Sequence, residues 1–174
     1  MDAETVSGIY GYLADRGVKI WIDGGWCVDA LLGRQTRRHP DLDVALGRED
    51  EERFVEHMAG LGYTKRHDGD DTAWNYVLTD DRGHSVDVHV FECDESGRNV
   101  YGIAYPHGSL TGAGTINGRT VACVAPEWMF AFKTAYVPAD KDFKDVHALS
   151  EAFGFEIPPT HRRSPGHEAQ GELT

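Results

Sequence analysis

The sequence predicts an α/β (α+β) domain in which helices pack against a small mixed β-sheet. Apolar residues recur three and four positions apart near both ends of the chain, which is the period of an amphipathic helix. Short apolar runs bounded by glycine are typical of buried strands. Two alternating segments also flank a polar turn of four residues, a pattern that predicts an antiparallel pair.

Five elements are predicted in the N-terminal half. Apolar residues at i, i+3, i+4 and i+7 give the first helix, and a glycine follows each predicted helix and ends it. Pro40 keeps the residue before it out of a helix, so residues 34–40 are expected to form a loop. In order, the elements are a helix over Ala3–Arg16, a strand over Val18–Ile22, a short helix over Trp26–Leu32, a strand over Leu42–Leu46, and a helix that starts near Glu49 and buries Phe54, Val55, Met58 and Leu61.

The C-terminal half is expected to begin with antiparallel strands and to end with helices. Asp80–Gly83 forms the first turn, and Asn117-Gly118 is a tight-turn signal. Pro126 suits the first position of a helix. The elements are strands over Ala73–Thr79 and Ser85–Phe91, a hairpin around Asn117, a helix over Pro126–Tyr136, and a helix over Asp142–Phe153 that buries Phe143, Val146, Leu149 and Phe153. One domain is expected over residues 1–157, followed by a polar, disordered tail over 158–174.

Composition excludes several classes of protein. Of 174 residues, 40% are hydrophobic and 26% charged, as in a soluble globular domain. No apolar run reaches the roughly 20 residues that cross a bilayer, and the acidic N-terminus lacks a signal-peptide pattern. Three cysteines without CxxC spacing support neither a disulfide framework nor a zinc ribbon. The expected location is therefore the cytoplasm, without a membrane partner.

The chain is strongly acidic. Its 17 Lys and Arg residues face 29 Asp and Glu residues, which gives a formal net charge of −12. Such a charge disfavours binding to nucleic acid by general electrostatics. It is compatible with a cationic small-molecule substrate, although acidity is also a common route to solubility.

A double glycine, Asp23-Gly24-Gly25-Trp26, lies between a predicted strand and a short helix. Glycines at such a turn let backbone N–H groups approach a phosphate, and the helix N-terminus favours its negative charge. Gly-Gly turns are common, so the motif alone is a weak indication.

Asp41-Leu42-Asp43 opens the next predicted strand. Alternation puts residues 41 and 43 on the same face, so both carboxylates can reach one metal ion or a pair. Two carboxylates this close repel each other unless a cation lies between them. Mg²⁺ suits them, because it takes oxygen ligands and bridges to nucleotide phosphates. Such pairs also occur on solvated strand edges.

Asp87 faces the same side as His89 on a separate, Val-rich strand. A carboxylate there is costly to bury without a partner, although an edge strand with its polar face in water would explain it equally well. Three acids on adjacent strands near a phosphate-binding turn together indicate a two-metal site for in-line transfer of a phosphorus group.

These motifs resemble those of the small lincosamide nucleotidyltransferases and the related aminoglycoside 2''-nucleotidyltransferases, which belong to the polymerase β-like nucleotidyltransferase superfamily. The resemblance covers roughly residues 15 to 150, and the usual Gly-Ser of the superfamily is Gly-Gly here, as in the lincosamide-type enzymes. It implies the nucleotidyltransferase fold and transfer of a nucleoside monophosphate from an NTP to an antibiotic hydroxyl, with release of pyrophosphate. The residues that carry it are Trp21–Trp26, Asp29, Leu31, Gly33, Arg37, His39, Asp41–Asp43 and Val86–His89.

The resemblance also implies roles for the site residues. Gly24 and Gly25 would hold the triphosphate through backbone amides, and Asp41 and Asp43 would bind Mg²⁺. Asp87 would either complete the metal site or remove the proton of the acceptor hydroxyl. ATP is the expected donor.

Other residues are candidates with a plain structural alternative. Glu92 and His89 follow Asp87 as candidate bases, although His89 also suits a surface position. Lys133 shares a helical stripe with apolar residues, so its ammonium either reaches the triphosphate or lies in solvent. Asp29 is expected to make a structural hydrogen bond, and His39 either fixes its loop or contributes to the site.

The acceptor side is the least defined. Tyr101 begins a stretch rich in Gly and Thr that also contains Tyr105 and His107, and the acids over residues 68–71 are further acceptor-site candidates. A loop of this composition is equally consistent with a plain surface connection.

The leading hypothesis is a Mg²⁺-dependent nucleotidyltransferase acting on a hydroxyl of a small molecule, with lincosamide and aminoglycoside antibiotics as candidate acceptors. One alternative keeps the chemistry but modifies a protein or RNA, and a second is a catalytically degenerate nucleotide-binding module. The chain is short for the superfamily, so a homodimer is one way in which the acceptor pocket could be completed.

Overall fold

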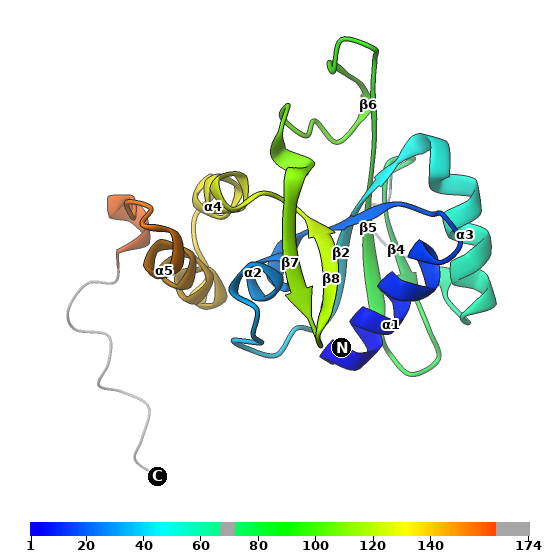
Figure 1. The fold of residues 1–174 in the computed structure, drawn as a ribbon, viewed down its shortest axis with the longest axis horizontal. Helices are drawn as coiled ribbons and strands as arrows, with labels where there is room; N and C mark the ends of the chain where they lie inside the picture. The colour runs from blue at the N-terminus through cyan, green and yellow to red at the C-terminus, as the bar shows by residue number, and fades with distance from the viewer. Residues whose placement is uncertain (67–71, 163–174) are drawn as a thin grey trace.

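The computed structural model describes residues 1–66 and 72–162 and contains one mixed eight-stranded sheet (Figure 1). The strand order is β3-β4-β5-β2-β1-β8-β7, and β6 pairs with β5 beyond this path. β2 is parallel to β5, and β1 is parallel to β8. The strands are β1 (Ile20–Ile22), β2 (Asp41–Gly47), β3 (Thr64–Lys65), β4 (Asn75–Thr79), β5 (Ser85–Cys93), β6 (Asn99–Gly102), β7 (Gly112–Ile116) and β8 (Arg119–Cys123).

The α-helices form two groups around the sheet. α4 and α5 pack against each other and against α2 at one end of the molecule, whereas α3 lies at the other end, beside β4 and β5 (Figure 1). The helices are α1 (Ala3–Ala14), α2 (Gly24–Leu32), α3 (Glu51–Gly60), α4 (Pro126–Thr134) and α5 (Asp140–Phe153), with 3₁₀ turns at Arg48–Asp50, Ser109–Thr111 and Pro159–His161. None of the helices in the described residues is long and apolar enough to cross a membrane.

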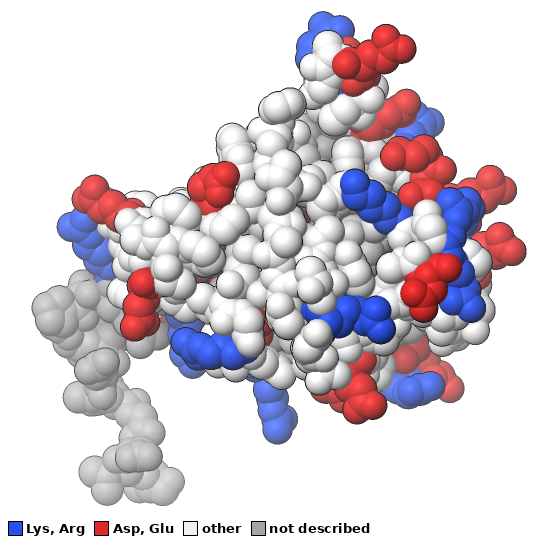
Figure 2. Space-filling model, in the orientation of Figure 1, with Lys and Arg blue, Asp and Glu red and all other residues white. Residues whose placement is uncertain are grey.

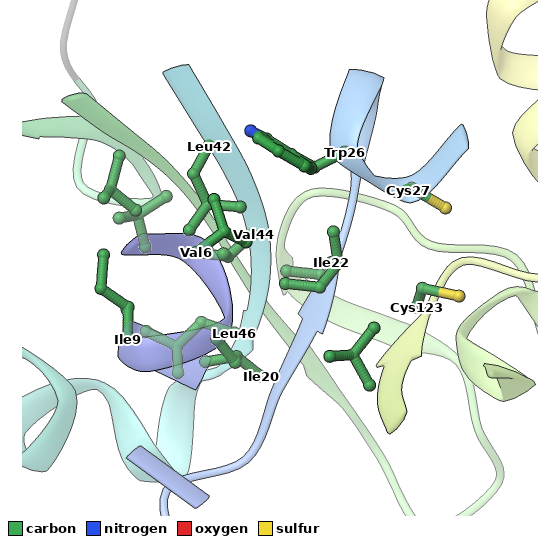
Figure 3. Packing of buried hydrophobic residues seen from close by; sticks show 14 of the residues in the cluster. Val6, Ile9, Ile20, Ile22, Trp26, Cys27, Leu42, Val44, Leu46 and Cys123 are labelled. Atoms are coloured by element: carbon green, nitrogen blue, oxygen red, sulfur yellow. The ribbon is translucent and has the colours of Figure 1, made fainter. Parts of the chain in front are cut away.

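The core is formed where α1 packs on the central strands. Val6 and Ile9 of α1 lie against Leu42, Val44 and Leu46 of β2 (Figure 3). Leu42, Val44 and Leu46 are thus buried on one face of β2, and Asp41 and Asp43 turn to the opposite face. Burying this apolar set fixes which face of β2 and β5 carries the acids.

Most predicted elements are present close to their expected bounds, which confirms the predicted mixed sheet with packed helices. The prediction that Val55 and Phe153 are buried is wrong, because Val55 is 40% exposed and Phe153 is 39% exposed. Phe54 and Met58 form the buried side of α3, and Phe153 stacks on Phe155 instead of entering the core.

Three further differences concern segments without an apolar pattern. β3 has exposed residues only, and β6 has two exposed residues followed by two half-buried ones, so neither strand carries the alternation that reveals a half-buried strand. The chain also stays ordered beyond Pro158, where His161 is 1% exposed, so the expected tail starts too early. Residues 68–71 and the remainder of the tail, 163–174, lie outside the described residues.

Charged side chains on the face shown in Figure 2 gather over α3 and around α5, and the part over β7 and β8 is largely uncharged. Lys and Arg are interspersed with Asp and Glu there and form no continuous basic field on this face.

Gly114 sits where β7 touches α2, and a Cβ there would overlap the backbone carbonyl of Ala30. Gly114→Ala is therefore expected to lower the free energy of unfolding by about 1–3 kcal/mol through overpacking. Gly8→Ala is the matched control, because a Cβ at this position in α1 meets nothing within 4 Å. It should be neutral or stabilise by up to about 1 kcal/mol. Urea unfolding of both variants measures the difference, and equal stabilities would contradict this assignment.

Candidate active site

Strand register brings four aspartates to one face of the sheet. The parallel pairing of β2 with β5 sets Asp43 beside Asp87, and Asp41 lies on the same face two residues earlier. At the end of β1, the Asp23 N–H donates to the Asp43 carbonyl at 2.9 Å. Asp23 therefore lies beside Asp43 at the end of the neighbouring strand. The predicted meeting of the β2 and β5 acids is thus present.

A cavity of about 330 Å³ opens at this face. Asp41 and Asp43 contribute its acidic lining, while Arg37, Lys133 and Lys141 contribute basic lining. The two charge signs come from different parts of the fold, because the acids stand on β2 and the lysines on α4 and α5. Such a cavity can accept a ligand that bears both negative and positive charge.

Asp43 is electrostatically crowded. Burial, together with repulsion from Asp41 and Asp23, raises the pKa of its carboxyl to about 6 from the usual 3.8. The Asp87 carboxylate adds to this repulsion. Unless a cation is bound there, the folded protein therefore holds these charges together at a cost in stability.

His89 stands between two of these carboxylates. Its Nδ1 lies 3.6 Å from Asp23 Oδ2, and its Nε2 lies 3.6 Å from Asp87 Oδ1. Burial alone would lower the pKa of the imidazole, but attraction to both acids outweighs it and raises the pKa to about 10. The predicted alternative of a plain surface histidine is therefore wrong, since the His89 ring lies between the carboxylates of Asp23 and Asp87.

Tyr105 locks Asp23 in place from above the sheet. Its hydroxyl donates to Asp23 Oδ2 at 2.6 Å, and Asp23 Oδ1 accepts the Gly24 N–H at 2.7 Å. Burial raises the Asp23 pKa, but hydrogen bonds from His89, Tyr105 and Gly24 outweigh burial and leave the pKa below its usual value. Asp23 is therefore an ionised cap that ties α2 to β5.

The acids fit a hard cation such as Mg²⁺. Asp43 and Asp87 each offer a carboxylate oxygen, and these oxygens lie within 4.8 Å of each other and of a ring nitrogen of His89; the protonated His89 ring itself has no free lone pair for a metal ion. Asp87 Oδ1 is buried and has no hydrogen-bond partner among the described residues, which a bound cation would supply. Asp41 lines the cavity but is not a member of this set, so the tightest set differs from the expected trio.

The double glycine is required by the side chains of the site. Gly24 has φ +58°, and a Cβ there would overlap the Asp43 carboxylate. A Cβ on Gly25 would overlap His39 and would lie 2.5 Å from Arg37 Nη2. Both amides were expected to hold phosphate. The Gly24 N–H is already bonded to Asp23, whereas the Gly25 N–H has no hydrogen-bond partner among the described residues.

Asp29 and His39 organise the loop that leads into β2. Both are buried, and Asp29 Oδ2 lies 2.5 Å from His39 Nε2. Asp29 Oδ1 also accepts bonds from Thr36 N and Oγ1, at 3.0 and 2.5 Å. The expected structural role of Asp29 is thus present, and His39 both fixes the loop and lines the cavity.

Lys133 is buried. Its Nζ lies 3.0 Å from Asp145 Oδ2 and 3.5 Å from Asp142 Oδ1, and its side chain is 8% exposed. The alternative of a solvated surface lysine is therefore wrong. Lys133 also lines the cavity, where its ammonium can face a bound triphosphate.

Glu92 and Tyr101 lie away from the carboxylates. They pair across β5 and β6, on the face opposite to Asp87 and His89 because strand residues alternate. Arg48 bonds Glu92 at 2.8 Å and stacks 3.9 Å from the Tyr101 ring centroid. The structure therefore does not bring Glu92 or Tyr101 to the carboxylates within one chain. Alternation along β5 already places Glu92 on the face opposite to Asp87.

Comparison with known proteins decides the family. The model of the aminoglycoside-2''-adenylyltransferase family matches residues 5–149. The chain belongs to this family. It is therefore a nucleotidyltransferase, as the motifs around Gly24 and Asp41 indicated.

Individual members of the family are more distant. A lincosamide resistance protein of Staphylococcus haemolyticus is 24% identical over 142 residues, which is 76% of this chain and 84% of that protein. A 2''-aminoglycoside nucleotidyltransferase of Escherichia coli is 41% identical, but over 66 residues, which is 34% of this chain and 37% of that protein. The chain is thus related to both kinds of enzyme.

Solved structures share the fold. The lincomycin-bound lincosamide adenylyltransferase LnuA superposes with a TM-score of 0.72 at 20% identity, covering 84% of this chain and 95% of that one. ANT(2'')-Ia in complex with adenylyl-2''-tobramycin gives a TM-score of 0.69 at 23% identity, covering 86% of this chain and 88% of that one. These likenesses establish the nucleotidyltransferase fold of this family member.

Sequence reasoning missed several residues of the site. Asp23 was treated as part of a turn, although its position before a double glycine is typical of a helix cap. Asp142 and Asp145 were not among the candidate residues, yet both are 1% exposed. Their spacing of three residues on one side of a helix was the available signal.

Asp43→Asn is expected to stabilise the metal-free protein above about pH 6. Because the folded pKa of Asp43 is about 6 and the usual value is 3.8, the folded state binds more protons in this interval. The free energy of unfolding therefore falls as pH rises through it and stays lowered above it. Asparagine removes this loss, which is about 1–3 kcal/mol.

Urea unfolding in EDTA at about pH 4.5 and about pH 8 measures this difference, which should be larger at the higher pH. Asp81→Asn in the exposed β4–β5 turn is the control and should show no such pH dependence. If Asp43→Asn raised the free energy of unfolding equally at both pH values, the raised pKa of Asp43 would be contradicted.

Proposed function

We propose that the protein transfers a nucleoside monophosphate, with ATP as donor and Mg²⁺ as cofactor, to a hydroxyl of an aminoglycoside or lincosamide antibiotic. The observation that carries this proposal is the pairing of Asp43 with Asp87 beside a cavity that also contains Gly25. Membership in the aminoglycoside-2''-adenylyltransferase family supports ATP as the donor. Resistance to such an antibiotic would be the biological role.

Acidic residues of the chain would hold the metal ion, and basic residues would bind the triphosphate. Asp41, Asp43 and Asp87 would hold Mg²⁺, which when bound withdraws charge from phosphate oxygens and acidifies a hydroxyl. The basic lining from Lys133 and the Gly25 amide would face the triphosphate.

The transfer itself needs one proton acceptor. The acceptor oxygen attacks the α-phosphorus, the bond to the bridging oxygen breaks, and pyrophosphate leaves. The hydroxyl proton must go to a base, and Asp87 is the candidate because its Oδ1 is buried and has no hydrogen-bond partner among the described residues. Its alternative role is completion of the metal site, and a Mg²⁺ titration distinguishes the two roles.

The direct test incubates the purified protein with Mg²⁺, each of the four NTPs and a panel of aminoglycosides and lincosamides. Mass spectrometry should detect an antibiotic carrying one nucleoside monophosphate, and pyrophosphate should be released in equal amount. Omission of Mg²⁺ should abolish the product. Binding of an NTP without any product would overturn the antibiotic assignment, and a failure to bind any NTP would favour a degenerate module.

Asp87→Asn is expected to slow transfer by about 100- to 10,000-fold, the contribution of a positioned base. If Asp87 is the base, the Mg²⁺ concentration for half-maximal rate should stay unchanged; if it is a ligand, that concentration should rise. Initial rates over a Mg²⁺ titration distinguish the two roles, with Asp81→Asn as the control. Normal turnover by Asp87→Asn would contradict both.

A further inference from the structure

Three buried charged residues and one partly buried arginine connect α4 and α5 to the cavity. We call Arg37, Lys133, Asp142 and Asp145 the α4–α5 ion cluster. Arg37 belongs to the loop before β2, and Lys133 belongs to α4, whereas both acids stand on α5. The two cations line the cavity, and the two acids lie behind them, each 1% exposed.

Asp145 is the acid that both cations share. Arg37 donates to it twice, from Nε to Oδ1 and from Nη2 to Oδ2, both at 2.9 Å, and Lys133 Nζ lies 3.0 Å from Oδ2. Asp142 is instead occupied by the Tyr136 hydroxyl at 2.7 Å and by the Ala139 N–H at 3.0 Å. Asp145 therefore fixes the direction of the Arg37 guanidinium.

The guanidinium of Arg37 stands over the double glycine. A Cβ on Gly25 would lie 2.5 Å from Arg37 Nη2, so this cation occupies the space where a Gly25 side chain would be. Two of its five N–H groups bond Asp145 and a third bonds the Arg38 carbonyl at 3.3 Å. The other two have no partner among the residues that the structure describes.

The cluster is better suited to binding an anion than to holding the fold. A buried ion pair contributes little net stability compared with a well-packed apolar set, because desolvation offsets the attraction. A guanidinium held by two parallel bonds, by contrast, presents its remaining N–H groups in a fixed plane, which matches phosphate oxygens. Its place at the cavity wall meets the same requirement.

Resting on the function proposed above, we propose that Arg37 binds the triphosphate of the donor nucleotide and that Asp145 is its positioning residue. Asp145 touches no substrate; it orients Arg37, and with it Lys133, toward the phosphates. α5, which contributes no acid to the metal site, thereby becomes part of the nucleotide site.

Binding of ATP in the presence of Mg²⁺ and without acceptor, measured by calorimetry, tests this proposal. Arg37→Gln should weaken binding by about 10-fold or more, the loss of a charge-assisted contact, and Arg37→Lys should recover part of it. Asp145→Asn should weaken binding similarly. Lys144→Gln, at an exposed position on the same helix, is the matched control and should bind as the wild type does.

The double variant Arg37→Gln/Asp145→Asn separates positioning from a general structural role. If Asp145 acts mainly through Arg37, the double variant should bind ATP about as weakly as Arg37→Gln alone. Losses that multiply would overturn the positioning role. If Asp145→Asn does not fold, as judged by circular dichroism, the two Arg37 variants still decide the phosphate contact.

Two negative outcomes are distinct. If the wild type binds none of the four NTPs, the proposed function fails and this inference fails with it. If the wild type binds ATP and Arg37→Gln binds it equally well, this inference alone is overturned, and the nucleotidyltransferase assignment stands.

Discussion

Parallel pairing of β2 with β5 sets Asp43 opposite Asp87 and, two residues on, Ala45 opposite His89. The antiparallel β1 adds Asp23 at its end, next to Asp43. A shift of this register by one residue would send the acids into the apolar core and Val44 and Val88 into the cavity. The apolar faces of β2 and β5 therefore determine the site, because burying them leaves the acids a single face to occupy.

The cost of this arrangement is visible in its surroundings. Burial and the neighbouring acids raise the pKa of Asp43, and His89 is held as a cation between two acids. Around this negative centre the fold places a glycine turn without room for a Cβ and a wall of cations tied to α5. Negative and positive groups are thus kept apart on separate elements, which is the arrangement expected of a site that joins a metal ion to a polyphosphate.

The elements with strong periodicity were predictable one by one. α1, β2 and β5 bury the residues that their patterns indicate, and the face shared by Asp87 and His89 followed from alternation alone. Weakly patterned segments were not predictable: β6 is only partly buried, and its pairing with β5 depends on a bulge after Glu92. Glu92 stands an odd number of positions from Asp87, so alternation already put it on the other face of β5. Tyr101 was misplaced because β6 has no apolar alternation that would locate it.

The sequence by itself determined the family and the acids at Asp41, Asp43 and Asp87, because short-range spacing on strands decides which side chains share a face. Only the tertiary structure decided that Asp23, Tyr105 and His89 form one hydrogen-bonded group, and that Arg37 meets Asp145 across 108 positions of the chain. Contacts of this kind arise from the packing of α5 and of the Tyr105 loop onto the sheet. No local pattern records them, since each partner alone is an ordinary polar residue.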